Sequence, residues 1–152
     1  IEGNRFRGNS VALHLEGANR IEVEANEFVG NGWAVQVLAN SDGSDFARNN
    51  FVGNSFDVST NSRSTSSTFR GNYWDRYRGY DLDRDGVGDV AFRPVRLFSL
   101  VVEQNEPVVV LQRSMLVELL DLAEAVLPVL TPGKLADAEP SLLPLSTPWR
   151  TP

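Results

Sequence analysis

The stretch Asn26-Glu-Phe-Val-Gly-Asn31 decides the fold, because it is one copy of a hexad, Asn-x-Phe-x-Gly-Asn, that recurs along the first half of the chain. Four copies are recognisable, of which the last keeps everything but its first Asn: residues 4–9, 26–31, 49–54 and 67–72. The phenylalanines at the third position follow one another after 22, 23 and 18 residues: Phe6, Phe28, Phe51 and Phe69. Repeats with a period of about 20 to 50 residues indicate a solenoid of stacked coils. We therefore expect these four rings to lie in a single column.

The residues between the hexads alternate with the period of a β-strand. Counting from each Phe, every second position is expected to be buried: Val11, Leu13, Leu15, Trp33, Val35, Val37, Phe56, Val58 and Thr60. The intervening positions, mostly small or polar, are expected to face outward: Ala12, His14, Ala34, Gln36, Asp57 and Ser59. A further short strand is expected around Val23 and Phe46, each five residues before the next Phe. This pattern predicts an all-β fold, a right-handed single-stranded parallel β-helix of about three to four coils over residues 1–75.

Each hexad ends in Gly-Asn, which predicts a sharp turn at that corner of the coil. Glycine accepts a positive φ without a Cβ clash, and Asn tolerates the same region. Amides in successive coils would lie about 4.8 Å apart, close enough to hydrogen-bond to one another. We expect such a ladder, with a structural rather than a ligand-binding role, to be formed by Asn9, Asn31, Asn54 and Asn72.

The repeat gives way near Trp74, where aromatic side chains are expected to close the core, and an acidic segment and cap, residues 76–94, follows. Its residues match positions one, three, five, six, seven and nine of a calcium-binding loop: Asp81, Asp83, Asp85, Gly86, Val87 and Asp89. The twelfth position, where an EF-hand has a bidentate Glu, is Phe92. Two interpretations stay open. One is a structural calcium site, and the other is a turn whose Asp side chains cap their own backbone and are partly neutralised by nearby arginines.

A helical period replaces the strand period in residues 95–130. Apolar residues recur there at helical spacing and predict an amphipathic helix from about Ser114 to Pro128: Leu116, Leu119, Leu120, Ala123 and Leu127. This helix packs across the end of the coils, docks on a partner, or does both. The tail, residues 131–152, contains five prolines, and we expect it to be extended and ordered only by a partner.

The composition argues against several classes of protein. A net charge of −6, with 14 basic residues scattered rather than clustered, gives no basic surface for nucleic acid. No apolar stretch approaches the roughly 18 residues needed to cross a bilayer. Cysteine is absent, which excludes disulfides and thiolate metal sites. Because the sequence begins inside a repeat, we expect a carboxy-terminal piece of a longer protein, and its lack of a signal peptide carries little weight.

Three stretches together resemble the NosD family: Gly-Asn-Tyr-Trp-Asp at residues 71–75, the acidic run at 81–89, and Leu-Phe-Ser-Leu at 97–100. The resemblance extends to about Thr131. It implies a non-enzymatic β-helix scaffold in the periplasm that works with the permease of an ATP-binding cassette (ABC) transporter. It further implies a part in maturing the copper centre of a client metalloenzyme, nitrous oxide reductase.

Copper binding by this chain itself is not expected. Cuprous sites favour Cys or Met and cupric sites favour His, yet the chain offers only His14 and Met115, a hundred residues apart. The alternative function is binding or cleavage of a polysaccharide, as in other β-helix proteins. Cleavage needs two acids about 5 to 10 Å apart. Asp57 is the only acid at the outward positions above, while Glu22 and Glu24 lie on another strand and do not recur. A surface adhesion passenger would explain the coils but neither the helix nor the tail.

Overall fold

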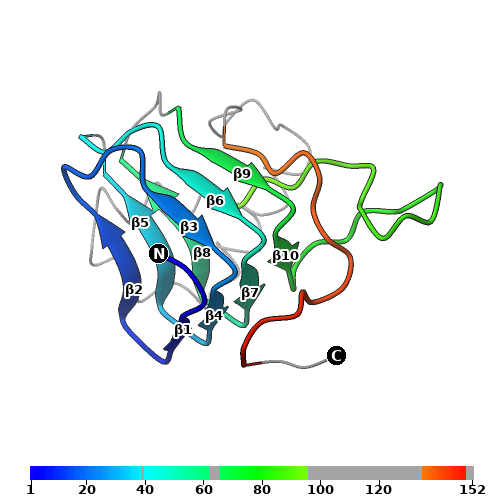
Figure 1. Ribbon diagram of the computed structural model, residues 1–152, viewed down its shortest axis with the longest axis horizontal. Coiled ribbons are helices and arrows are strands. Elements are labelled where there is room, and N and C mark those ends of the chain that lie inside the picture. Colours follow the sequence, from blue (N-terminus) through cyan, green and yellow to red (C-terminus); the bar gives the residue numbers. More distant parts are fainter. Residues whose placement is uncertain (39, 62–65, 96–134, 150–152) are drawn as a thin grey trace, which may run out of the picture.

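The computed structural model describes residues 1–38, 40–61, 66–95 and 135–149. Strands in these residues pair in parallel and form three sheets that run along a stack of coils (Figure 1). The first sheet contains β1 (Arg5–Arg7), β4 (Glu27–Val29), β7 (Asn50–Val52) and β10 (Tyr73–Trp74). The second contains β2 (Val11–Leu15), β5 (Trp33–Val37) and β8 (Phe56–Thr60), and the third contains β3 (Glu22–Glu24), β6 (Asp45–Ala47) and β9 (Thr68–Arg70). Successive coils therefore add one strand to each sheet, and the expected parallel β-helix is confirmed.

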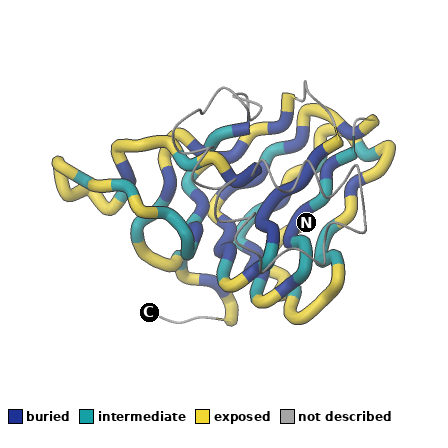
Figure 2. Tube along the Cα trace, turned by 180° about the vertical axis from the view of Figure 1, so that it is seen from behind, coloured by how far each residue is buried: buried dark blue, intermediate teal, exposed yellow. Residues whose placement is uncertain are grey.

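The inward side chains of the three sheets form one continuous core. Its most deeply buried members come from every coil: Val23, Phe28, Val35, Val37, Phe46, Phe51, Val58 and Trp74. In Figure 2 the buried stretches of successive coils lie side by side, as expected where each coil covers the one before it. Burying one such large apolar side chain stabilises the fold by about 1.5–3 kcal/mol, so most of the stability of the stack comes from this core.

The aromatic column differs from the prediction in its fourth member. Phe6, Phe28 and Phe51 are in register, and their ring centroids are 5.0 and 4.9 Å apart. The next ring over Phe51 is Trp74, at 4.1 Å. The prediction of a single column of four phenylalanines is wrong at Phe69, which belongs to the third sheet.

A second corner of the coil has nearly the same local sequence, and this explains the displaced ring. Phe69 lies in register with Phe46, with ring centroids 4.7 Å apart, and Phe46 is in turn in register with Val23. Two residues after each comes a residue with positive φ, followed by Asn: Ala25 (54°), Arg48 (53°) and Gly71 (62°). The hexad corner uses the same device, with positive φ at Gly8, Gly30 and Gly53. The fourth copy, residues 67–72, therefore belongs to the other corner.

Asparagine ladders run along both corners. In the expected ladder Asn9 donates through Nδ2 to Oδ1 of Asn31 (3.1 Å), and Asn31 donates in the same way to Asn54 (3.0 Å). Asn72 is not part of it, but ends a second ladder with Asn4, Asn26 and Asn49. At each step the backbone N–H of one Asn also donates to Oδ1 of the next. The amides thus satisfy backbone groups at the corners, in agreement with the structural role predicted for them.

A further layer, here called the closing layer, covers the last coil. It consists of two separate segments, one at Val95 and the other at residues 135–141. Three parallel bridges place it over the preceding strands: Val95 beside Val58, Asp137 beside Phe69, and Ser141 beside Tyr73. Val95, Leu135 and Asp137 are almost completely buried. The closing layer therefore shields the end of the core as another coil would.

Residues 142–149, here called the C-terminal strap, then cross the outside of the first sheet (Figure 1, orange to red). The backbone N–H and C=O of Leu145 make two hydrogen bonds to the side-chain amide of Asn50, at 2.9 and 2.8 Å. Two further hydrogen bonds follow, from Thr147 Oγ1 to Glu27 Oε1 (3.1 Å) and from Trp149 Nε1 to the Gly3 carbonyl (3.2 Å). Residues 135–149 are thus held by the coils of the same chain, and the prediction that only a partner orders the tail is wrong for them.

The outward face of the second sheet is only partly open to solvent. His14 is exposed as expected, whereas Ala34, Asp57 and Ser59 are buried. The guanidinium of Arg76 lies 3.8 Å from the Asp57 carboxylate. The expectation of a solvent-facing row is therefore wrong for Ala34 in β5 and for Asp57 and Ser59 in β8.

The predicted helical segment lies outside the described residues except for Val95. The same is true of the five residues assigned to cap packing or partner docking: Leu116, Leu119, Leu120, Ala123 and Leu127. The described part of the chain contains no helix, and therefore none that could span a membrane.

Candidate functional site

The segment after β10 projects from the coils and carries the acidic loop, residues 81–89 (Figure 1). Tyr77 fixes its base, since its hydroxyl donates to the Val90 carbonyl (2.7 Å). A Cβ added to Gly79 or Gly88 would lie 1.8 or 2.1 Å from that hydroxyl oxygen, so glycine is required where the ring packs. Two backbone hydrogen bonds join the loop to the tail, from Gly88 N to Pro140 O (2.8 Å) and from Leu142 N to Gly86 O (3.1 Å).

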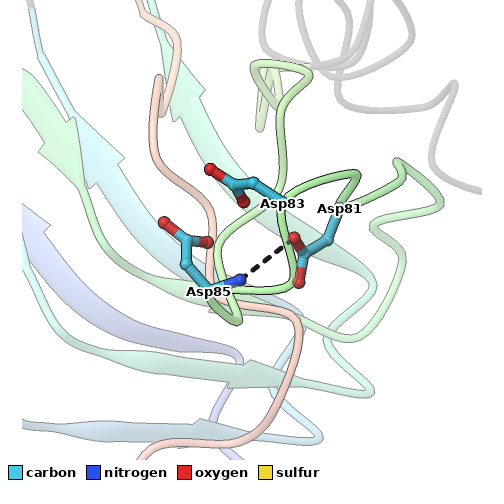
Figure 3. A group of neighbouring side chains, drawn as sticks. All are labelled: Asp81, Asp83 and Asp85. Atoms are coloured by element: carbon cyan, nitrogen blue, oxygen red, sulfur yellow. Dashed lines mark hydrogen bonds between the residues drawn. The ribbon is translucent and has the colours of Figure 1, made fainter.

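Three carboxylates meet at the tip of this loop. Asp81, Asp83 and Asp85 each offer an oxygen, and these oxygens all lie within 4.8 Å of one another (Figure 3). Among the described residues this is the one group of His, Cys, Asp or Glu side chains compact enough to hold a metal ion. The sequence predicted five calcium ligands, with Gly86 as the turn residue: Asp81, Asp83, Asp85, Val87 and Asp89. The loop brings the first three together.

The same carboxylates are also hydrogen-bonded to their own backbone. Asp81 accepts from the N–H groups of Arg84 (2.5 Å), Asp85 (3.2 Å) and Gly86 (3.0 Å), one of which is drawn in Figure 3. Arg84 and Gly86 have positive φ, at 64° and 88°, which lets the chain fold back on this side chain. The second interpretation of the sequence, a self-capping turn, is therefore visible in the geometry, and calcium binding stays a prediction.

The electrostatics of the triad are unequal. Partial desolvation of the Asp81 carboxylate raises its pKa, but hydrogen bonds led by that from Gly86 N–H lower it, and the net pKa is below the ordinary value. The pKa of Asp83 is raised, first by the negative charge of Asp85 and then by desolvation. At neutral pH the ionised triad is therefore under mutual repulsion, which a bound divalent cation would relieve.

The two remaining predicted ligands lie differently. Asp89 accepts a hydrogen bond from the N–H of Leu82 (2.7 Å), across the loop, and is not part of the compact group. The N–H of Val87 donates to Asp85 (2.8 Å). Val87 also forms an antiparallel bridge with Ser141 of the tail. The carboxylate of Asp89 and the backbone of Val87 thus hold the loop closed.

A pair of acids on the third sheet was missed by the sequence analysis. Glu22 and Asp45 are register partners on neighbouring strands, so an acid does recur at this position. Asp45 is engaged, however, with Arg70 (2.7 Å) and with the Thr68 hydroxyl (2.7 Å). The hydrogen bond from Arg70 is the largest cause lowering the pKa of Asp45. Acid–base cleavage of a sugar needs one carboxyl with a raised pKa, which this pair does not provide through Asp45.

His14 shows no metal-binding neighbourhood among the described residues. Its Nδ1 lies 3.1 Å from Gln36 Oε1, and its Nε2 lies 3.7 Å from a Glu16 carboxylate oxygen. One imidazole with one carboxylate is a poor donor set for copper, and the expectation that this chain does not itself bind copper stays a prediction.

Three residues that organise the tail were not singled out from the sequence: Glu27, Asn50 and Asp137. Glu27 and Asn50 occupy the second position of the hexad, which is also polar in the first copy, where it is Arg5. The recurrence of a polar residue directly before each core Phe was the signal in the sequence that could have indicated an outward polar row covered by another segment. Asp137 gave no such signal, because it lies 65 residues from the Asn72 that it contacts.

Comparisons with known proteins identify relatives of this chain. A family model described as "Periplasmic copper-binding protein (NosD)" matches residues 1–79. The chain is 30% identical over 141 residues to the "Probable ABC transporter binding protein NosD" of Pseudomonas aeruginosa. It is 29% identical over 141 residues to the protein of the same description from Stutzerimonas stutzeri. Both alignments cover 92% of this chain and 28% of the relative, so the chain spans less than a third of the length of these proteins. The family model spans the coils and their first closing aromatics, more than half of the residues, and the chain therefore belongs to the NosD family.

Proposed function

We propose that the chain is part of a non-enzymatic periplasmic accessory protein of an ABC transporter, which supports maturation of the copper centre of nitrous oxide reductase. The observation that carries the proposal is membership of a family described as periplasmic and copper-binding, with relatives named as ABC transporter binding proteins. Copper handling and the client enzyme come from the resemblance, and the coils of this chain are proposed to contribute a scaffold.

The chemistry of the described surface supports a scaffold over an enzyme. Glu27 is buried and lies 3.3 Å from Arg5, and Asp57 is buried beside Arg76. Both carboxylates are buried beside an arginine, so neither is presented to a polysaccharide on the outer surface of the coils. The acidic loop fits the same proposal as a structural calcium site at the end of the coils. Release of reducing sugar from an acidic polysaccharide by the purified protein would contradict the non-enzymatic assignment.

The permease is proposed to contact the apolar side of the segment containing Leu116 to Leu127. Deleting residues 114–152 would be a poor test, because it removes Asp137 and the C-terminal strap as well. Substitution within the segment avoids this problem. We expect Leu119→Glu with Leu120→Glu to abolish copurification of the permease with the complete protein. The matched control, Glu118→Gln with Glu124→Gln on the opposite predicted side, should retain it. Retention in both variants would contradict docking through this segment.

The role in copper maturation has its own test. In cells whose complete gene product is removed, we expect nitrous oxide reductase to accumulate without its copper centre, measured as copper per purified enzyme. Copper-replete reductase from these cells would contradict the proposed role while leaving a transporter partnership intact.

A further inference from the structure

A row of polar side chains on the outward face of the first sheet lies beneath the C-terminal strap. Strand register places Arg5, Glu27 and Asn50 on successive coils. Although they belong to an outward row, Glu27 is only 3% exposed and Asn50 is not exposed at all. Their hydrogen bonds to the strap, described above, account for this burial. The row is therefore a surface already occupied by an extended piece of polypeptide.

The contacts define what kind of chain this row accepts. Asn50 binds the N–H and the C=O of one residue, Leu145. Both contacts are to the backbone, so they do not select the side chain at this position. Such a two-point contact matches a polypeptide, in which every residue except proline offers one N–H donor and one C=O acceptor. Two residues further on, the hydroxyl of the buried Thr147 donates a hydrogen bond to the Glu27 carboxylate. The intervening Ser146 is exposed. This spacing of two residues is that of an extended chain, in which alternate residues share a face.

The strap is attached mainly by polar groups. Leu143 and Trp149 remain 71% and 55% exposed, so they lose little apolar surface to the coils. Each hydrogen bond between strap and coil replaces hydrogen bonds to water and contributes little net free energy. Ordering an extended segment costs conformational entropy at every residue. A segment with few buried apolar contacts opens locally without unfolding of the core.

From this we propose that the C-terminal strap is a displaceable intramolecular ligand, and that the row beneath it is a docking site for an extended segment of a partner protein. The partner segment offers the N–H and the C=O of one residue, which is not proline, to Asn50, and a Ser or Thr hydroxyl two residues later to Glu27. The buried Glu27 carboxylate keeps its ion pair with Arg5 (3.3 Å), so the row stays assembled while the strap is exchanged. This site includes none of the residues from Leu116 to Leu127 and does not depend on the identity of the transporter.

The first experiment uses the full chain with Leu145→Pro and Thr147→Val, here called the released variant. Proline suits an extended backbone but lacks the N–H that Asn50 accepts, and valine lacks the hydroxyl. The probe is a fluorescent peptide of residues 141–149. We expect it to bind the released variant saturably, one to one, and about tenfold or more tighter than the unaltered chain. In the unaltered chain the tethered strap competes with the peptide at an effective concentration in the millimolar range. Ser146→Val, at an exposed strap residue, is the matched control and should bind the peptide as weakly as the unaltered chain does.

Two further changes test the named contacts. Asn50→Ala in the released variant, and a peptide carrying Thr147→Val, should each weaken binding by about tenfold to a hundredfold, as expected for hydrogen bonds that include a charged group or a two-point contact. Equal binding of the peptide to the released variant and the unaltered chain overturns the proposal. So does an absence of binding to a released variant that retains cooperative thermal unfolding.

Hydrogen exchange of the unaltered chain tests whether the strap opens independently of the coils, even where the released variant does not fold. The N–H of Leu145 is expected to exchange by local opening, on the order of a hundredfold or more faster than the backbone N–H of Asn50, which is hydrogen-bonded to Asn26 within the first sheet. Equal protection of the two amides would mean that the strap opens only when the coils unfold, and a displaceable ligand would be excluded.

Discussion

The carboxylate of Asp137 lies over Asn72 where the next asparagine of the ladder would be expected. Its Oδ2 accepts hydrogen bonds from the backbone N–H and from Nδ2 of Asn72, each at 2.9 Å. One coil earlier, Asn49 makes the same pair of bonds to Oδ1 of Asn72, at 2.9 and 3.1 Å. Trp74 Nε1 also donates to Asp137 (3.0 Å). A carboxylate accepts hydrogen bonds and has no N–H of its own to satisfy, so it ends a ladder that another asparagine would extend.

Removing this carboxylate should destabilise the end of the stack. Asp137→Ala leaves buried donors of Gly71, Asn72 and Trp74 without an acceptor, and we expect a loss of about 2–4 kcal/mol in the free energy of unfolding, measured with urea. Asp137→Asn keeps one acceptor oxygen and should cost less. The exposed neighbour Glu139 is the control, and Glu139→Ala should change stability by no more than about 0.5 kcal/mol. Equal effects at the two positions would contradict the ladder-ending role.

The register of the aromatic column can be tested by a double-mutant cycle. Phe51 and Trp74 are stacked neighbours, so Phe51→Leu and Trp74→Leu should show a coupling of about 0.5–1.5 kcal/mol in chemical unfolding. The comparison pair, Phe6→Leu with Phe69→Leu, lies in different columns and should be additive within about 0.3–0.5 kcal/mol. Additive effects of Phe51→Leu and Trp74→Leu would contradict the stacking of these two rings.

Calcium binding to the acidic loop is expected as a saturable heat in titration calorimetry, with an affinity on the order of 10⁻⁴–10⁻³ M, as for extracellular calcium modules. Asp83→Ala combined with Asp85→Ala removes two of the three converging carboxylates and should abolish it. Glu16→Ala removes one exposed carboxylate on another part of the surface and should leave it unchanged. Flat heats for the unaltered protein would reduce the loop to a self-capping turn.

The contact between Asp45 and Arg70 gives a pH-dependent contribution to stability. Because Arg70 holds the pKa of Asp45 below its unfolded value, the contribution is present above that value and is lost as the pH falls through the folded pKa. We expect Asp45→Asn to lower stability at pH 6–7 by less than about 1 kcal/mol, since the pair is solvent-screened. The difference from the unaltered protein should shrink as the pH falls from the unfolded pKa of Asp45 through its lower folded pKa, because the carboxyl is then protonated in both states. A difference that persists unchanged in acid would assign the effect to packing.

The sequence predicted the coils because an inward Phe and a turn residue followed by Asn are local requirements repeated in every layer. It misplaced Phe69 because two corners of each coil meet the same local requirement, one at Gly53 and the other at Arg48, and the hexad does not distinguish them. The distance along the chain does distinguish them. Phe69 follows Phe46 by 23 residues and Trp74 follows Phe51 by 23, whereas Phe69 follows Phe51 by only 18.

The sequence predicted the acidic loop as a motif but did not predict how all of its side chains are oriented. Its three convergent carboxylates follow from the spacing of Asp81, Asp83 and Asp85 within one tight turn. The direction of Asp89 depends on the N–H of Leu82 across the loop, which spacing alone does not specify. The position of the tail against the coils could not be predicted from the sequence for a similar reason. Its prolines indicate an extended chain, but the partners Asn50 and Glu27 lie 95 and 120 residues away.

The closing layer has a consequence for the order of folding. Steps along the ladder that ends at Asn72 join residues 22 or 23 apart, whereas the step from Asn72 to Asp137 spans 65. Closing a longer loop costs more chain entropy and is slower than forming the nearby contacts between coils. The coils should therefore form first, with the edge of β10 still able to pair with another chain until residues 135–141 arrive. During synthesis that interval lasts until residues 135–141 have emerged from the ribosome, and it is then that the coils are most exposed to misassembly.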